Sequence, residues 1–318
     1  MKDLIDTSAS PEQLLRIEHI EIASGRGKGN EILQVWNGML YFEVNVSRGF
    51  DIRACYFKGL PVSWFSPCGH VSPSSYDPTG DAWNRGFEGG LLTTCGLEHA
   101  GKVEENYGLH GRFSYQEAEI DEKRITKNEI ILSATIREVK VGGYYYQMRR
   151  TISSALLQNK ILITDTITNM GSKRSPLMLL YHINWSPLLF HDESSLVHMH
   201  GSWELVRASK PSMMAAKYSE MKDGDFDVIS CTDVEHKDNQ VKLHLKTQEM
   251  HIEVSYDARQ LPALTQWRLK GSAGNVISWE PGNVSTRGHQ YHEKVGSLPY
   301  LEPNEEKSYS LAFAFNEK

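Results

Sequence analysis

The sequence has few cysteines and no closely spaced pair of them. Its 318 residues include only Cys55, Cys68, Cys95 and Cys231, which lie far apart. Without a C-x-x-C motif the chain cannot form a zinc ribbon, and so few scattered thiols argue against a disulfide framework. We therefore expect reduced thiols and a cytoplasmic protein.

The chain also lacks long apolar runs and an excess of positive charge. Runs such as Pro176–Leu180 are far shorter than the roughly 18 residues that a membrane-spanning helix needs. The N-terminal residues contain neither the apolar segment nor the cleavage site of a secretory signal. Lysines and arginines number 34 against 40 aspartates and glutamates, a formal net charge of −6. We expect neither a membrane nor a nucleic acid as partner.

Helix signals are scarce as well. Residues 10–13 form a capping box with proline at the first helical position, which predicts one short helix ending near Ile17. Residues 212–221 could form another. Elsewhere no apolar period of 3.6 residues persists long enough to predict a helix.

Alternation of apolar and polar residues dominates the chain. Short alternating segments, rich in β-branched residues and bounded by Gly, Asn, Asp or Pro, occur at residues 42–46, 130–136, 161–168, 241–246, 252–255 and 309–315. This pattern predicts an all-β protein built as a large antiparallel sandwich or barrel. The sequence has no repeat and no linker-like stretch, so we expect residues 1–318 to form a single domain.

One glycine-rich stretch, residues 76–111, differs from the alternating segments. It predicts long loops with little regular structure, and such loops inside a compact domain are usually functional. A second unusual stretch, residues 267–287, contains the sequence Trp-Glu-Pro-Gly after a strand-like run.

Several weaker motifs suggest chemistry that we do not favour. Gly25–Gly29 superficially resembles a phosphate loop, but its glycine spacing does not fit and no strand or helix flanks it. The histidine pairs 198/200 and 289/292 lack further ligands at suitable spacing, so we expect no metal. Cys95 could act as a nucleophile beside a histidine, although a lone cysteine in an apolar run is more often a core residue.

A stronger set of residues is spread along the chain. His110 lies between two glycines, where the backbone can approach a ligand closely. His182 ends an apolar strand, and Glu280 follows another. Because Pro281 cannot donate to a strand ladder, we expect the ladder to end there and Glu280 to lie at a sheet edge or cleft.

These residues stand in runs that resemble a known family. Residues 83–97 (WNRGFEGGLLTTCGL) and 108–112 (GLHGR) resemble the signature of the aldose 1-epimerase-like proteins of the DUF4432 type. Residues 180–184, 265–267 and 279–282 match later blocks of that family, and residues 48–52 match an early one. The resemblance runs from about residue 30 to residue 285, most of the chain.

The resemblance implies a fold and a set of site residues. The family belongs to the galactose mutarotase-like superfamily, whose members are large antiparallel β-sandwiches that bind a sugar in a cleft on the concave face. Mutarotases use an arginine, two histidines and a late glutamate, which by order and spacing correspond to Arg85, His110, His182 and Glu280. They also use an aspartate that holds sugar hydroxyls. Asp223, Asp225 and Asp227 lie in a plausible region, but none sits in a matching motif.

The implied reaction is the interconversion of sugar anomers through ring opening, which needs one base, one acid and no cofactor. We expect Glu280 to act as the base and His182, protonated at rest, as the acid. An indole of Trp279 lying over Glu280 would shield it from water. Arg85 and His110 would hold hydroxyls and polarise the ring. Trp267 could stack on a sugar and Gln266 could bind its hydroxyls, although either could instead pack in the core.

The same residues fit other functions. The same acid and base could serve another epimerase, an isomerase or a lyase acting on a sugar or sugar acid. The chain could also be a carbohydrate sensor without catalysis, or a glycosidase, which would need a second carboxylate. The partner we expect is a small sugar or sugar acid, and the chain would be a monomer or a homodimer.

Overall fold

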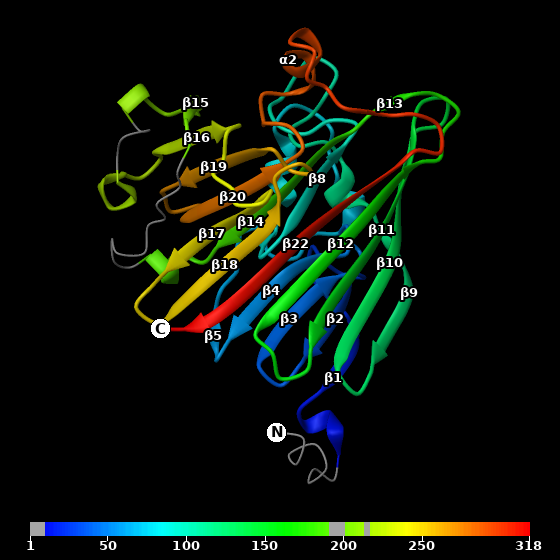
Figure 1. The fold of residues 1–318 in the computed structure, drawn as a ribbon, viewed down its shortest axis with the longest axis vertical. Coiled ribbons are helices and arrows are strands. Elements are labelled where there is room, and N and C mark those ends of the chain that lie inside the picture. The colour runs from blue at the N-terminus through cyan, green and yellow to red at the C-terminus, as the bar shows by residue number, and fades with distance from the viewer. Residues whose placement is uncertain (1–9, 191–200, 213–216) are drawn as a thin grey trace.

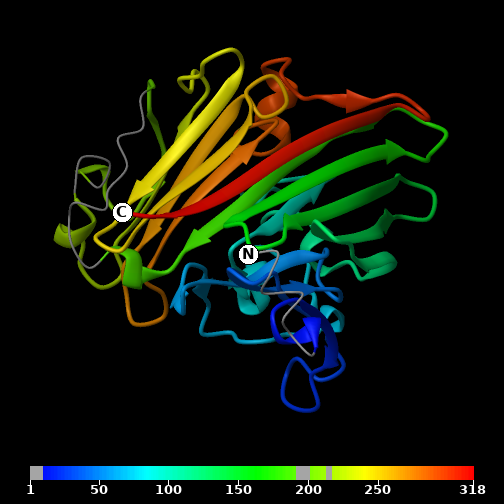
Figure 2. The same ribbon diagram turned by 60° about the horizontal axis from the view of Figure 1, so that its bottom comes forward.

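The computed structural model describes residues 10–190, 201–212 and 217–318, and it consists mostly of antiparallel strands (Figures 1 and 2). The largest sheet has seven strands, and every neighbouring pair in it is antiparallel. In spatial order these strands are β17 (Gln240–Lys246), β18 (Met250–Asp257), β22 (Glu306–Glu317), β12 (Lys160–Asn169), β11 (Tyr145–Ala155), β10 (Glu129–Val139) and β9 (Ala118–Ile125). The prediction of an all-β fold is confirmed.

Two further sheets accompany the seven-stranded one. The six-stranded sheet has the order β15 (Glu204–Ala208), β16 (Phe226–Cys231), β19 (Ala263–Leu269), β20 (Val276–Gly282), β14 (Met178–Trp185) and β8 (Thr93–Leu97). The five-stranded sheet, blue in Figure 1, runs in chain order through β1 (Arg16–Glu21), β2 (Glu31–Trp36), β3 (Leu40–Asn45), β4 (Asp51–Phe57) and β5 (Leu60–Pro61). Two short pairs join β6 (Trp64–Phe65) to β7 (Gly89–Gly90) and β13 (Ser175–Pro176) to β21 (Tyr300–Leu301).

The helices in the described residues are short, and none could cross a membrane. They are η1 (Pro11–Gln13), η2 (Pro73–Ser75), η3 (Ala82–Gly86), η4 (Phe113–Tyr115), η5 (Pro187–Phe190), η8 (Tyr218–Glu220) and α2 (His289–Lys294). The first predicted helix exists but ends at Gln13, because strand β1 already begins at Arg16. The described part of the second includes the short helix η8.

The glycine-rich stretch at residues 76–111 contains more regular structure than we expected. Besides the loops it holds β8, which pairs with β14 and is buried along its whole length. The two threonines at its start are β-branched and suit a strand. Residues 93–97 are therefore a strand within a stretch for which we predicted long loops with little regular structure.

All three large sheets bury side chains in one shared core. Its members include Leu33 and Phe42 of the five-stranded sheet, Leu132 of the seven-stranded sheet, and Tyr181 and Trp279 of the six-stranded sheet. The alternation explains this arrangement, since every second residue of a strand points to the same face. The three large sheets thus share one hydrophobic core, and the single domain stays a prediction.

A buried arginine joins the three sheets within that core. Arg150 of β11 donates to both carboxylate oxygens of Asp165 in β12, at 2.8 and 2.6 Å. It also donates to Asp51 of β4, to the carbonyl of Gly49 and to the hydroxyl of Thr94 in β8. All five N–H groups of the guanidinium are therefore used, which is the condition for burying it without a large desolvation cost.

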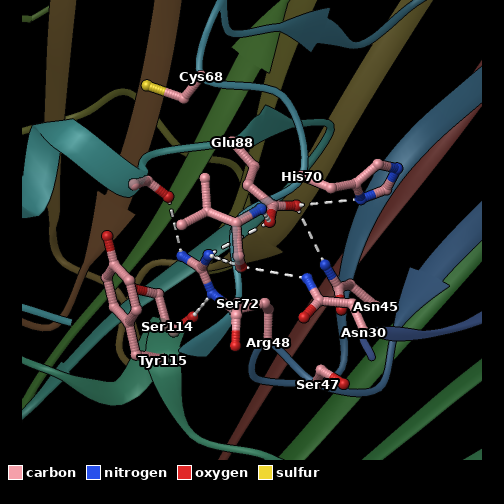
Figure 3. A network of polar contacts seen from close by, with 12 residues as sticks. Asn30, Asn45, Ser47, Arg48, Cys68, His70, Ser72, Glu88, Ser114 and Tyr115 are labelled. Carbon is pink, nitrogen blue, oxygen red and sulfur yellow. Dashed lines mark hydrogen bonds and ion pairs between the residues drawn. The ribbon is translucent and has the colours of Figure 1, made fainter. Parts of the chain in front are cut away.

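A second buried arginine fastens the segment between β6 and β8 (Figure 3). Arg48 donates to the carbonyls of Ser114, Val71 and Gly86, at 2.6, 3.0 and 3.1 Å, and to Glu88 at 3.3 Å. Glu88 also accepts from the Val71 amide at 2.7 Å. These bonds hold η3 and the residues that follow it against the end of β3.

We predict that Arg150→Met strongly destabilises the protein. The substitution leaves two buried aspartates without their counter-charge, and removing one partner from such a network typically costs about 3–5 kcal/mol. The free energy of unfolding from urea titrations measures the loss. Arg259→Met is the matched control, because Arg259 is largely exposed in its ion pair with Asp257 and its removal should change stability little. Equal effects of the two variants would refute the role given to Arg150.

Candidate active site

Strands β14, β19 and β20 bring three of the predicted site residues to one face of the six-stranded sheet. The register pairs Asn184 with Ser278 across β14 and β20, and Thr265 with Glu280 across β19 and β20. Because side chains alternate along a strand, this register places His182, Glu280 and Trp267 on the same face. That face is opposite the one that contributes Tyr181 and Trp279 to the shared core.

His182 and Glu280 are in direct contact. Nε2 of His182 lies 3.2 Å from Oε1 of Glu280, and the two side chains are only 3% and 2% exposed. The hydroxyl of Ser278 donates to the same carboxylate oxygen at 2.5 Å. Sequence reasoning missed Ser278, although its position two residues before Glu280 on a strand would have placed it on the same face.

His110 joins this pair from the glycine-rich stretch. Its ring lies edge-on to that of His182, with 5.6 Å between the ring centroids. His110 has a left-handed backbone with φ of 58°. Gly111, which follows it, has φ of 71°, and a Cβ there would clash with the carbonyl oxygen of His99. The glycine beside His110 is thus required by the backbone geometry that presents the imidazole.

Aromatic rings surround His182. Their centroids lie 5.1 Å away for Phe87, 5.7 Å for Trp267 and 6.3 Å for Trp83. The Trp83 indole is fixed by its N–H, which donates to the Ser114 hydroxyl at 2.9 Å. Trp83 and Phe87 both belong to the run 83–97 that carries the family resemblance, but sequence reasoning assigned neither a place in the site.

The described contacts do not bring Arg85 or Gln266 to this centre. The Arg85 side chain is 78% exposed, and its charged partner is Asp77 at 3.7 Å. Gln266 pairs with Trp279 across β19 and β20, so it points to the face opposite Glu280. The predicted side chains that meet are therefore those of His110, His182, Trp267 and Glu280.

Trp279 does not lie over Glu280, which was the condition for its indole to shield the carboxylate. Consecutive residues on a strand point to opposite faces, so the indole turns away from the carboxylate. It packs edge-on against Trp185 in the shared core, with centroids 5.0 Å apart. The rings near the candidate pair are instead those of Phe87, Trp83 and Trp267, which lie around His182.

Burial controls the protonation of both site histidines. It lowers the pKa of His182, and the adjacent Glu280 carboxylate opposes this shift only in part. Burial, reinforced by His182, lowers the pKa of His110 well below its ordinary value. Burial therefore favours neutral imidazoles at this site, which differs from our expectation that His182 is protonated at rest.

The weaker motifs gain no support as catalytic groups. Burial raises the pKa of the Cys95 thiol well above its ordinary value, which disfavours a nucleophilic thiolate. Residues 25–29 form a turn between β1 and β2, so strands flank the motif, contrary to our expectation, but no helix follows it. His292 is used structurally, because its two ring nitrogens bond Ser297 and Ser285 at 2.8 and 2.9 Å.

No cluster of metal ligands occurs in the part of the chain that the structure describes. His198 and His200 lie outside those residues.

The three candidate aspartates have other partners. Asp227 pairs with Arg268 on the face opposite Glu280, Asp225 lies 3.2 Å from Lys210, and Asp223 accepts from the Ser272 amide at 2.9 Å.

The sequence matches one protein family over most of its length. A family model described as a domain of unknown function, DUF4432, covers residues 27–315. The chain belongs to this family. No curated protein matches the sequence significantly.

Solved structures share the fold of this DUF4432 protein. A candidate aldose 1-epimerase from Klebsiella pneumoniae subsp. pneumoniae aligns over 95% of this chain and 83% of its own, with a TM-score of 0.82 and 19% identity. A galactose mutarotase-like protein from Clostridium acetobutylicum aligns over 96% and 100%, with a TM-score of 0.66 and 13% identity. A candidate aldose 1-epimerase from Escherichia coli K12 aligns over 91% and 100%, with a TM-score of 0.63 and 13% identity. The chain therefore has the galactose mutarotase-like fold.

We predict that acid destabilises the folded protein through its buried histidines. In the unfolded chain a histidine binds its proton near pH 6.5, whereas burial lowers the pKa of His99 to about 4 and that of His110 well below its ordinary value. Their contribution is therefore complete above about pH 6.5 and is lost as the pH falls toward about 4. His110→Asn, which suits a left-handed backbone, should reduce the slope of unfolding free energy against pH by up to about 1.4 kcal/mol per pH unit.

Urea titrations at several pH values from about 7.5 down to about 4.5 span this window and test the prediction. His236→Asn, which replaces an exposed histidine, serves as the control substitution. An unchanged slope in His110→Asn would show that this imidazole titrates as it does in the unfolded chain.

Proposed function

We propose that this DUF4432 protein is an aldose 1-epimerase, in which Glu280 and His182 interconvert sugar anomers by acid–base catalysis. The observation that carries the proposal is the 3.2 Å contact between the imidazole and the carboxylate. The anomeric hydroxyl and the ring oxygen of an aldose are bonded to the same carbon. An acid and a base that serve both oxygens must therefore lie close together, as this pair does.

In the proposed reaction, Glu280 takes the proton from the anomeric hydroxyl while protonated His182 gives one to the ring oxygen. The bond between C1 and the ring oxygen breaks, and its electron pair goes to that oxygen. The open aldehyde rotates about the bond between C1 and C2. The ring oxygen then attacks the other face of C1 as both protons return. Ser278 would orient Glu280 throughout, through its 2.5 Å hydrogen bond.

The surroundings of the pair suit a sugar. The rings of Trp83, Phe87 and Trp267 would face the apolar C–H surface of a pyranose. Thr265, directly opposite Glu280 in the sheet, lies 3.5 Å from the hydroxyls of both Ser230 and Thr286. These three hydroxyl groups could form hydrogen bonds with the hydroxyl groups of a sugar. Since His182 and Glu280 are buried, a substrate reaches them only when neighbouring side chains move.

The alternative of a glycosidase receives less support. Hydrolysis of a glycosidic bond commonly uses two carboxyl groups about 5–9.5 Å apart on either side of the bond. The group that the structure places 3.2 Å from Glu280 is an imidazole, His182, and not a second carboxyl group. One carboxylate paired with one imidazole fits anomer exchange better.

We predict that Glu280→Gln and His182→Ala each lower the rate of anomer exchange by about 10²–10⁴, the usual contribution of a general acid or base. NMR exchange spectroscopy on neutral, acidic and deoxy aldoses measures the rate. Gln266→Ala is the matched control from the adjacent strand, because its side chain points to the other face and should leave the rate near that of the wild type. Normal exchange in Glu280→Gln would refute the proposed base, and a product that is not an anomer would assign a different epimerase.

We also predict that kcat/KM for anomer exchange rises as the pH is lowered from about 8. His182 must carry a proton to act as the acid, and burial lowers its pKa, so the protonated fraction grows as the pH falls. A pH series of exchange rates tests this expectation. A rate that rises with pH would indicate that a neutral His182 is the base instead.

A further inference from the structure

A row of aromatic side chains crosses the outer face of the five-stranded sheet. Trp36 of β2, Tyr41 of β3, Tyr56 of β4 and Phe65 of β6 follow one another, with successive ring centroids 4.7, 5.8 and 6.4 Å apart. The strands β2, β3 and β4 lie side by side in Figure 1. The opposite face of these strands packs into the shared core, so the row lies on the face that does not contribute to the core.

Guanidinium groups pack against both ends of the row. The Arg16 guanidinium carbon lies 3.7 Å from the centroid of the Trp36 ring, and that of Arg53 lies 4.8 Å from the centroid of the Phe65 ring. Such contacts hold exposed rings in fixed orientations. Phe65 remains 36% exposed. The rings are thus arranged before any ligand arrives, which lowers the entropic cost of binding one.

Polar groups run beside the rings. Glu43 accepts hydrogen bonds from Gln34 at 3.2 Å, from Arg53 at 3.2 Å and from the hydroxyl of Tyr41. The Glu43 and Arg53 side chains are largely buried, at 14% and 16% exposed. Glu43 and Arg53 therefore form a fixed ion pair beside the aromatic rings. Its carboxylate can accept hydrogen bonds and its guanidinium can donate them.

The four rings, Glu43 and Arg53 line an open groove of about 660 Å³, which also includes Met39 and Lys58. The volume lies in the range of small-molecule sites, about 300–1,000 Å³. A ligand for this groove needs apolar faces to stack on the rings and hydroxyls to bond Glu43 and Arg53. Saccharides combine these two features in every ring, and a row of successive rings suits a chain of sugar units.

We propose that this groove binds a neutral oligosaccharide and is separate from the catalytic centre. The two sites lie on either side of strand β6. Trp64 contributes its ring to the aromatic group around Trp267, with centroids 6.4 Å apart, whereas the next residue, Phe65, lines the groove. The groove would hold a saccharide chain without transforming it. The proposal is independent of the activity assigned to Glu280 and His182.

Isothermal titration calorimetry with cellopentaose and maltopentaose tests the groove, with glucose as the single-unit comparison. We expect saturable binding of at least one pentasaccharide and weaker binding of glucose. Trp36→Ala and Phe65→Ala should each weaken that binding about tenfold or more, because each removes one stacking surface. Circular dichroism confirms that the variants are folded, and the two substitutions lie on different strands so that one misfolded variant leaves the test intact.

Two controls separate the groove from other binding surfaces. Tyr291→Ala removes an exposed aromatic ring from α2, outside the groove, and should leave pentasaccharide binding unchanged. Glu280→Gln should also leave it unchanged, whatever its effect on anomer exchange. Absence of binding by both pentasaccharides would overturn the proposal. Binding that survives Trp36→Ala and Phe65→Ala but is lost in Glu280→Gln would overturn it too, by assigning the sugar to the catalytic centre. A change of mass in light scattering caused by Trp36→Ala would also overturn it, by identifying the face as an interface between copies.

Discussion

The fully buried guanidinium of Arg150 constrains the arrangement of the three large sheets. Its five N–H groups bond Asp165, Asp51, Gly49 and Thr94, which belong to or border strands in all three sheets. Tyr181 completes the network by donating to Asp165 at 2.6 Å. A buried charge is costly unless every partner is in place, so these strands can approach only in the relative positions that satisfy Arg150. Apolar packing alone would tolerate small shifts between the sheets that this network does not.

The candidate site depends on that constraint through neighbouring residues on the same strands. Tyr181 points into the core and reaches Asp165, and His182, the next residue on β14, points the opposite way toward Glu280. Because neighbouring residues on a strand point to opposite faces, the hydrogen bonds that fix Tyr181 in the core also fix the position of the His182 imidazole on the other face. Arg48 acts similarly on the other side of the site, because it holds the segment that presents Trp83 and Phe87. Preorganised neighbours of this kind are what a catalytic pair needs in order to keep its geometry.

Much of the local structure could be predicted from alternation alone. The strands around residues 130–136, 161–168 and 309–315 are present as β10, β12 and β22, because burying one face of each strand requires that pattern. Local signals failed where tertiary contacts compete with them. The helix expected to reach Ile17 stops early because Arg16 and Ile17 pair with β2. Residues 93–97 form a strand within a glycine-rich stretch because they pair with β14. Gln266 and Trp279 were linked to the site by sequence proximity, and the sheet register turns both away from it.

The sequence by itself determined the all-β class, the family and the candidate acid and base, since these depend on residue types in short runs. It could not determine which strands are neighbours, because backbone hydrogen bonds form in the same way between strands that are close in the sequence and strands that are far apart in it. His182 and Glu280 are far apart in the sequence and 3.2 Å apart in space only because β14 pairs with β20. The same holds for the aromatic groove, whose rings come from four strands. The burial that lowers the pKa of both site histidines also arises from packing by distant elements, and only the tertiary structure decides it.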